Sequence, residues 1–184
     1  MGKNNFIDNY FQFIESIGGM NFIEELIPES MIDSSRVVEY EGIKCWKTIP
    51  STITKNEIFR IEKFYNTKLP KSFHDFLQYK FYMDLEVGEL SWRLFDLLPA
   101  GRLQSWIEVL ERDYRELIDD GYLVFGESDQ LCLCFNSNIV VADNDHEVGM
   151  VDLLERKYQK IADNFDHFIV QLQVWLSEWQ NRNS

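Results

Sequence analysis

The sequence has few of the features that mark membrane or secreted proteins. No apolar run approaches the roughly 20 residues that a membrane-spanning helix needs. The first residues are polar and include Asp8, where a signal peptide would need an unbroken apolar region. Three cysteines cannot form a closed disulfide framework. We therefore expect a cytoplasmic protein that does not associate with a membrane.

Motifs of catalysis are also missing. The chain has no Gly-x-Ser-x-Gly nucleophile elbow, no glycine-rich phosphate loop and no His-Glu-x-x-His zinc motif. There are 3 histidines. We expect His74 and His167 to point outward from helices and His146 to lie in a polar turn. The sequence predicts no catalytic residues and no cofactor. An enzyme acting on nucleotides or peptides is a third hypothesis, after the two binding functions given below.

Two groups of residues could in principle bind a metal ion: the three cysteines together with His146, and the acidic turn around His146. Cys132 and Cys134 alternate with apolar residues in an expected buried strand, so both face the same side. With Cys45 and His146 they could supply the four ligands of a zinc ion, but two thiols in one strand are poorly spaced for a metal. Small buried thiols are the favoured interpretation. The acidic turn 143–147 could bind a divalent cation through oxygen ligands, although it lacks the glycine and distal glutamate of an EF-hand loop. We predict no metal site.

Positive charge is scarce, and it is unevenly placed. The net charge is −13, yet the segment from Lys44 to Lys80 has a balance of +5 and the segment from Asp84 to Asp129 a balance of −8. An acidic surface repels nucleic acid and attracts basic proteins, which raises association rates by about 10–10³ at low salt. We therefore expect a basic protein partner and no direct binding of nucleic acid.

The chain contains enough apolar residues for a well-filled core. Of its 184 residues 45% are hydrophobic and 15% aromatic, and a chain of this length buries about 70% of its unfolded surface. Hydrophobic periodicity predicts helices at 4–17, 55–65, 70–77, 105–119 and 163–179, and strands at 43–49, 83–98, 123–126, 131–136, 139–143 and 146–152. We predict a single α+β domain over 1–184, an antiparallel-rich twisted sheet with helices packed against it, in which 1–45 form an N-terminal helical extension.

The most informative segment is a pair of short helices joined by a turn. Thr54 is a plausible N-cap with Glu57 as its capping-box partner. Asn66-Thr67-Lys68 breaks the first helix, and Pro70 suits the first turn of the second. The first helix has an apolar stripe of Ile58, Ile61, Phe64 and Tyr65, and the second one of Phe73, Phe76 and Leu77. This order of elements resembles the opening signature of the SMI1/KNR4 (SUKH) superfamily.

Further motifs of the same family follow in the expected order. They are Trp46 and Ile49-Pro50 before the signature, Tyr122-Leu123-Val124-Phe125-Gly126 followed by Gln130 to Phe135, an acidic turn of Asp143, Asp145, His146 and Glu147, and Ile161-Ala162 with Phe165 and Phe168. The resemblance spans 46–179 and implies an SMI1/KNR4-like fold.

Bacterial members of this family are mostly immunity proteins. The resemblance therefore implies a protein that binds a cognate toxin domain and blocks its active site. Many such toxins are nucleases with basic substrate channels, which an acidic protein could occupy. The alternative is a regulatory scaffold of the SMI1/KNR4 type without a toxin partner. Charge alone places the partner-binding surface at Asp84, Glu86, Glu89, Glu127 and Asp129. We expect a monomer or a weak dimer.

Overall fold

The computed structural model describes residues 8, 9, 11, 12, 21–83, 85–87, 92–100, 102–141 and 145–183. Its α-helices are α2 (Lys55–Tyr65), α3 (Lys71–Leu77), α4 (Arg102–Asp113), α5 (Arg115–Asp119) and α6 (Phe165–Asn183). Its strands are β1 (Asn21–Ile23), β2 (Ile43–Cys45), β3 (Ile49–Pro50), β4 (Lys80–Phe81), β5 (Leu85–Val87), β6 (Trp92–Leu94), β7 (Tyr122–Glu127), β8 (Leu131–Val141), β9 (Asp145–Asp152) and β10 (Tyr158–Ala162). Among the described helices, none is long and apolar enough to span a bilayer.

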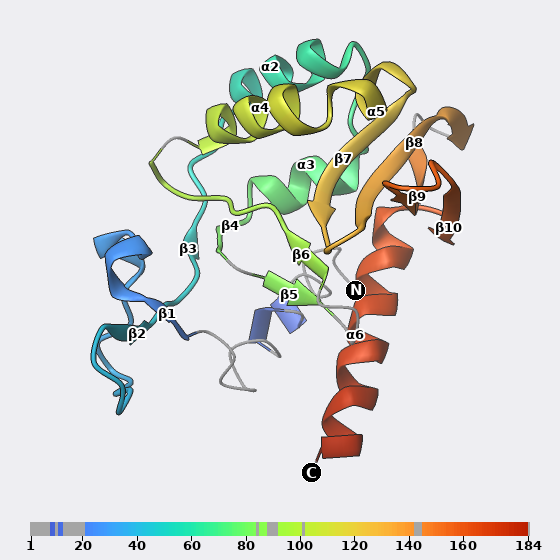
Figure 1. Cartoon of the computed structure of the whole chain (residues 1–184). Coiled ribbons are helices and arrows are strands. Elements are labelled where there is room, and N and C mark those ends of the chain that lie inside the picture. The colour runs from blue at the N-terminus through green and yellow to red at the C-terminus, as the bar shows by residue number, and fades with distance from the viewer. Residues whose placement is uncertain are drawn as a thin grey trace.

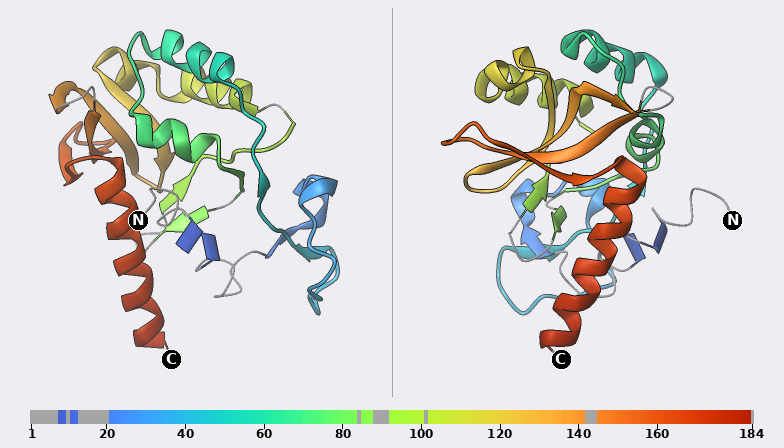
Figure 2. Two further views of the ribbon diagram at one scale, coloured as in Figure 1. Left: turned by 180° about the vertical axis from the view of Figure 1, so that it is seen from behind. Right: turned by 90° about the vertical axis from the view of Figure 1, so that its right-hand side faces the viewer.

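A six-stranded sheet organises the molecule. Its strand order is β10-β9-β8-β7-β6-β5, and every neighbouring pair is antiparallel. Helices α4 and α5 lie on one side of this sheet and α6 on the other (Figures 1 and 2). The predicted α+β class with an antiparallel sheet is confirmed. That residues 1–184 form a single domain stays a prediction.

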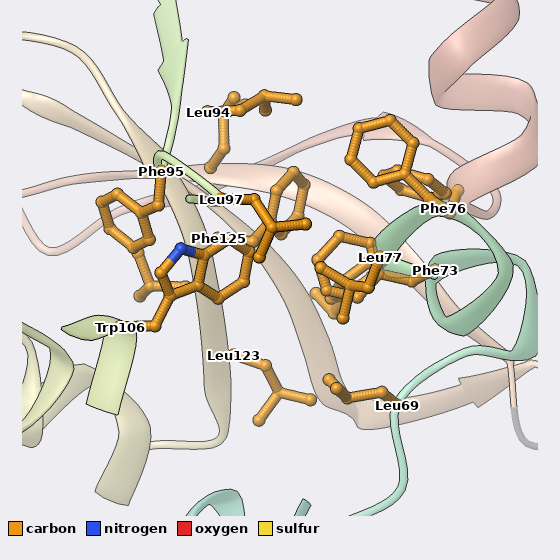
Figure 3. Packing of buried hydrophobic residues seen from close by; sticks show 14 of the residues in the cluster. Leu69, Phe73, Phe76, Leu77, Leu94, Phe95, Leu97, Trp106, Leu123 and Phe125 are labelled. Atoms are coloured by element: carbon orange, nitrogen blue, oxygen red, sulfur yellow. The ribbon is translucent and has the colours of Figure 1, made fainter. Parts of the chain in front are cut away.

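One face of the sheet, which we call the aromatic face, carries the core. Phe125 and Phe135 project from β7 and β8 against Phe73 of α3 and Phe165 of α6, with ring centroids 4.7 to 6.0 Å apart. All four rings are buried. Figure 3 shows the α3 side chains directed toward Phe125 and Leu97. The apolar stripes predicted for the two signature helices lie in one core with Phe165, Phe168 and Leu172 of α6, and Phe64 is only partly buried.

The turn between α2 and α3 is fixed by a buried carboxylate. Thr54 and Glu57 form the predicted capping box, and Asn66 ends α2 in the left-handed conformation. Glu62 is buried and accepts hydrogen bonds from Lys68 Nζ (2.7 Å) and the backbone N–H of Leu69 (3.2 Å). His74 Nε2 lies 3.1 Å from the same carboxylate. The prediction that His74 points outward is therefore wrong, because Glu62 holds its ring partly buried.

The N-terminal part differs from the predicted helical extension. Residues 21–45 contain β1 and β2, paired antiparallel, and two short 3-10 helices, Glu24–Leu26 and Glu29–Met31. The predicted helix at 4–17 lies mostly outside the described residues. Its buried Phe11 stacks on Phe76 of α3 (6.0 Å), which ties this end of the chain to the core.

Two predicted element boundaries are wrong for identifiable reasons. The helix predicted to begin at residue 105 begins at Arg102 as α4 and includes the buried Leu103. The break predicted between the strands 131–136 and 139–143 is a bulge inside the continuous strand β8. There Asn136 Oδ1 accepts the N–H of Asn138, and Ser137 donates from both its N–H and its hydroxyl to the Gly121 carbonyl. Strand β10 was not predicted.

Candidate functional site

A hollow of about 290 Å³ lies between the start of α4 and the strands β6 and β7, and it is partly open to solvent. It is lined by Arg93, Phe95, Asp96, Leu98, Ala100, Ser105, Trp106, Val109 and Glu127. The hollow lies on the face of the sheet that carries Glu127 and Cys132, which are paired neighbours on strands β7 and β8. We call this face the outer face.

The inner end of the hollow is aromatic and firmly held. The rings of Phe95 and Trp106 meet edge to face with centroids 5.8 Å apart, and Phe95 also contacts Tyr114 at 5.8 Å. Trp106 Nε1 donates to the backbone carbonyl of Asp96 (2.6 Å). Figure 3 shows Trp106 beside Phe125, with Phe95 next to it. These rings therefore have little freedom to change position.

The rim of the hollow is charged. Arg93 faces Glu127 across the β6–β7 pair, and Arg93 Nη2 lies 3.2 Å from Glu127 Oε1. The Tyr114 hydroxyl donates to the other oxygen, Glu127 Oε2. Burial, and then this hydrogen bond, hold the pKa of Tyr114 well above its usual range, so the phenol stays protonated and keeps donating. Glu127 is 30% exposed and is held by two donors.

The structure describes three of the five predicted partner-binding residues. Glu127 lies on the rim, and Asp129 is exposed between β7 and β8. The backbone of Glu86 pairs with Arg93 across the β5–β6 ladder, so the sheet places Glu86 and Glu127 on strands flanking Arg93. Asp84 and Glu89 lie outside the described residues. Neither Arg93 nor Tyr114 can be recognised from the sequence as a partner of Glu127, because both contacts require the folded sheet.

Other exposed carboxylates of the acidic segment lie on α4 and α5 and at the end of α5. They are Glu108, Glu111, Asp113, Glu116, Asp119 and, directly after α5, Asp120. Several take part in surface ion pairs: Asp113 with Arg112 (2.7 Å), Asp119 with Arg115 (3.1 Å) and Glu116 with Arg156 (2.5 Å). Exposed pairs of this kind contribute little to stability because solvent screens them. Their carboxylates add to the long-range negative field beside the hollow.

The residues considered for metal binding have other structural roles. Cys132 and Cys134 are buried on the outer face, and burial raises the pKa of Cys132 to about 12 and that of Cys134 further. His146 was expected in a polar turn, but it is buried in β9 with Nε2 3.0 Å from the Lys68 carbonyl. Glu147 is also buried, with Lys160 Nζ at 3.3 Å. Asp143 lies outside the described residues. In the described part of the chain, no three His, Cys, Asp or Glu residues are grouped to hold a metal.

The hollow offers few groups for catalysis. Among the described residues that line it there is no histidine, cysteine or lysine, and Ser105 is an exposed hydroxyl on α4. A general base within hydrogen-bond reach of a nucleophile would be expected in a hydrolytic site. The arrangement of an aromatic inner end and a charged rim is typical of a binding site.

Comparison with known families identifies the class of protein. Residues 52–171 match the SMI1 / KNR4 family (SUKH-1), and the chain belongs to this family. The SUKH family is known for toxin-immunity domains and is generally non-enzymatic. No curated protein matches the chain. The matched range begins just before α2 and ends within α6, so it contains the hollow but excludes the β1–β2 pair.

Proposed function

We propose that the protein is an immunity protein that binds a cognate bacterial toxin domain and blocks its active site. The observation that carries this proposal is the family match over residues 52–171. It is supported by the hollow, in which a rigid aromatic inner end adjoins a charged rim. Clefts at which a few polar groups surround an apolar surface are the usual form of a binding site.

The partner is proposed to be a basic toxin domain, of the nuclease type. The segment from Asp84 to Asp129 has a balance of −8 and contributes the strands and helices around the hollow. The proposed contact residues remain Asp84, Glu86, Glu89, Glu127 and Asp129. Arg93 and Tyr114 hold the carboxylate of Glu127, so this residue offers a fixed acceptor rather than a mobile charge. We expect the protein to act in the cytoplasm as a monomer or weak dimer.

Co-purification tests this proposal. An immunity gene is expected directly next to the gene for its toxin, so the toxin domain encoded there is expressed with the tagged protein. We expect a complex that survives purification and a loss of the toxin's activity at equimolar protein. The same toxin domain mixed with an unrelated acidic protein of similar charge is the control. A neighbouring toxin domain that neither binds nor is inhibited would contradict the proposal and favour the regulatory scaffold.

A further inference from the structure

The size of the hollow limits what it can hold. A volume of about 290 Å³ lies at the lower edge of small-molecule sites, which span about 300–1,000 Å³. A nucleotide or a large cofactor would extend far beyond such a space. One long side chain from a protein partner fits the dimensions better.

The inner end and walls favour a side chain that is both flat and aliphatic. Phe95 and Trp106, which are 9% and 3% exposed, close the inner end of the hollow with aromatic carbon, and the half-buried Leu98 and Val109 add aliphatic groups. A guanidinium group is planar and stacks on aromatic faces, and its three methylene groups pack on apolar surface. Lysine shares the aliphatic stem but has a compact, strongly hydrated head that stacks less well.

The rim favours a cation. Two carboxylates, Glu127 and Asp96, line the hollow together with one guanidinium, Arg93. A carboxylate has about four acceptor positions, and each oxygen of Glu127 receives one hydrogen bond, from Arg93 or from Tyr114. Each oxygen therefore keeps capacity for a further donor, which matches the two parallel N–H groups of an incoming guanidinium. The two carboxylates and Arg93 together leave one net negative charge, so the rim favours a cation over an acidic side chain.

We infer that this hollow is the receptor for one arginine side chain of the partner. The inference rests on the proposed function in that the partner is a basic toxin domain. The guanidinium lies against the Phe95–Trp106 rings and donates to Glu127, and its stem packs on Val109. Such a buried, central arginine is a common anchor of protein–protein interfaces. An apolar side chain would pack against the same walls of the hollow. It would not supply the N–H donors that the Glu127 carboxylate can accept.

The test uses short peptides, so it does not depend on the toxin. The isotope-labelled protein is titrated with acetyl-Gly-Arg-Gly-amide and with the same peptide carrying citrulline, the uncharged isostere of arginine, while the Trp106 indole resonance is followed. We expect saturable shifts at Trp106, Phe95 and Val109, with the citrulline peptide binding about tenfold more weakly because a charged donor is lost. A phenylalanine peptide serves as the apolar competitor.

Two neighbouring substitutions on α4 provide the matched control. Ser105 is exposed and lines the hollow, whereas Gln104 is exposed and does not. Ser105→Trp is expected to abolish the arginine-dependent shifts, and Gln104→Trp to leave them unchanged, with thermal unfolding showing that both variants fold. Equal binding of the arginine and citrulline peptides, stronger binding of the phenylalanine peptide, or undiminished shifts in Ser105→Trp would overturn the inference. Because wild-type binding to the toxin domain is measured separately, failure here is distinguishable from failure of the proposed function.

Discussion

The two faces of the sheet are built in opposite ways. On the aromatic face, Phe125 and Phe135 are enclosed by rings from α3 and α6, and no polar side chain takes part in these contacts. On the outer face, Glu127 and Arg93 remain partly exposed beside a hollow. Apolar packing determines whether the chain folds, and partly exposed, fixed polar groups are suited to recognition. The aromatic face is therefore built for stability, and the exposed part of the outer face is the proposed binding surface.

The largest expected effect is on the aromatic face. Phe73 is buried and contacts rings from α4, α6 and the sheet, so Phe73→Ala is expected to lower the free energy of unfolding by about 3–5 kcal/mol. The matched control is Phe59→Ala on α2, where the side chain is 57% exposed. Urea unfolding measures both. A loss at Phe73 no larger than that at Phe59 would remove the distinction between the faces.

A smaller effect is expected beside β10. Gly149 lies under the ring of Tyr158, and a Cβ atom added there would approach that ring to 2.4 Å. Gly149→Ala is therefore expected to cost about 1–3 kcal/mol of overpacking. Because the three nearest atoms all belong to Tyr158, the penalty should largely disappear in a Tyr158→Ser background. An unchanged penalty there would mean that another contact of Gly149 is responsible.

The hydrogen bond between Tyr114 and Glu127 has a still smaller effect on stability. Tyr114→Phe is expected to cost about 0.5–1.5 kcal/mol at pH 8. The pKa of Tyr114 is raised in the folded state by burial and by Glu127, whereas an unfolded tyrosine ionises near pH 10. The contribution is therefore constant below about pH 10 and is lost as the pH rises above it.

Urea midpoints between pH 8 and pH 11 measure this loss. Wild type should become less stable above about pH 10, and the slope should be shallower in Tyr114→Phe. Other buried tyrosines with raised pKa values, such as Tyr65, contribute to the remaining slope. Equal slopes in the two proteins would show that Tyr114 ionises normally in the folded state.

Local features of the fold were predictable from the sequence. The capping box of Thr54 and Glu57 and the apolar stripes of the signature helices depend on neighbours within one or two turns, so periodicity was sufficient to find them. The sequence predicts a break between the strands 131–136 and 139–143, because Asn and Ser favour turns in isolation. In the fold, Ser137 instead donates to the distant Gly121 carbonyl, and the strand continues.

The candidate site was predictable only in part. The acidic charge of the segment predicts Glu127 as a contact residue. The position of the Glu127 carboxylate, however, depends on Arg93, 34 residues away in the chain, and on Tyr114 at the α4–α5 junction. The burial of Glu62 was missed for the same reason, since a glutamate within a helix is usually solvated. Long-range pairing supplies the donors that make these positions possible, and a sequence pattern does not contain it.

The most direct test of the assignment of binding to the outer face is the rate of association with the neighbouring toxin domain. Wild type, Asp129→Lys and Lys63→Glu are compared at two salt concentrations, since both positions are exposed and screening acts over about 8 Å at physiological salt. We expect Asp129→Lys to slow association several-fold at low salt and to reduce its salt dependence, and Lys63→Glu to change little. Slower association in Lys63→Glu, with Asp129→Lys unchanged, would contradict the account and place the toxin against the basic helix α2 instead.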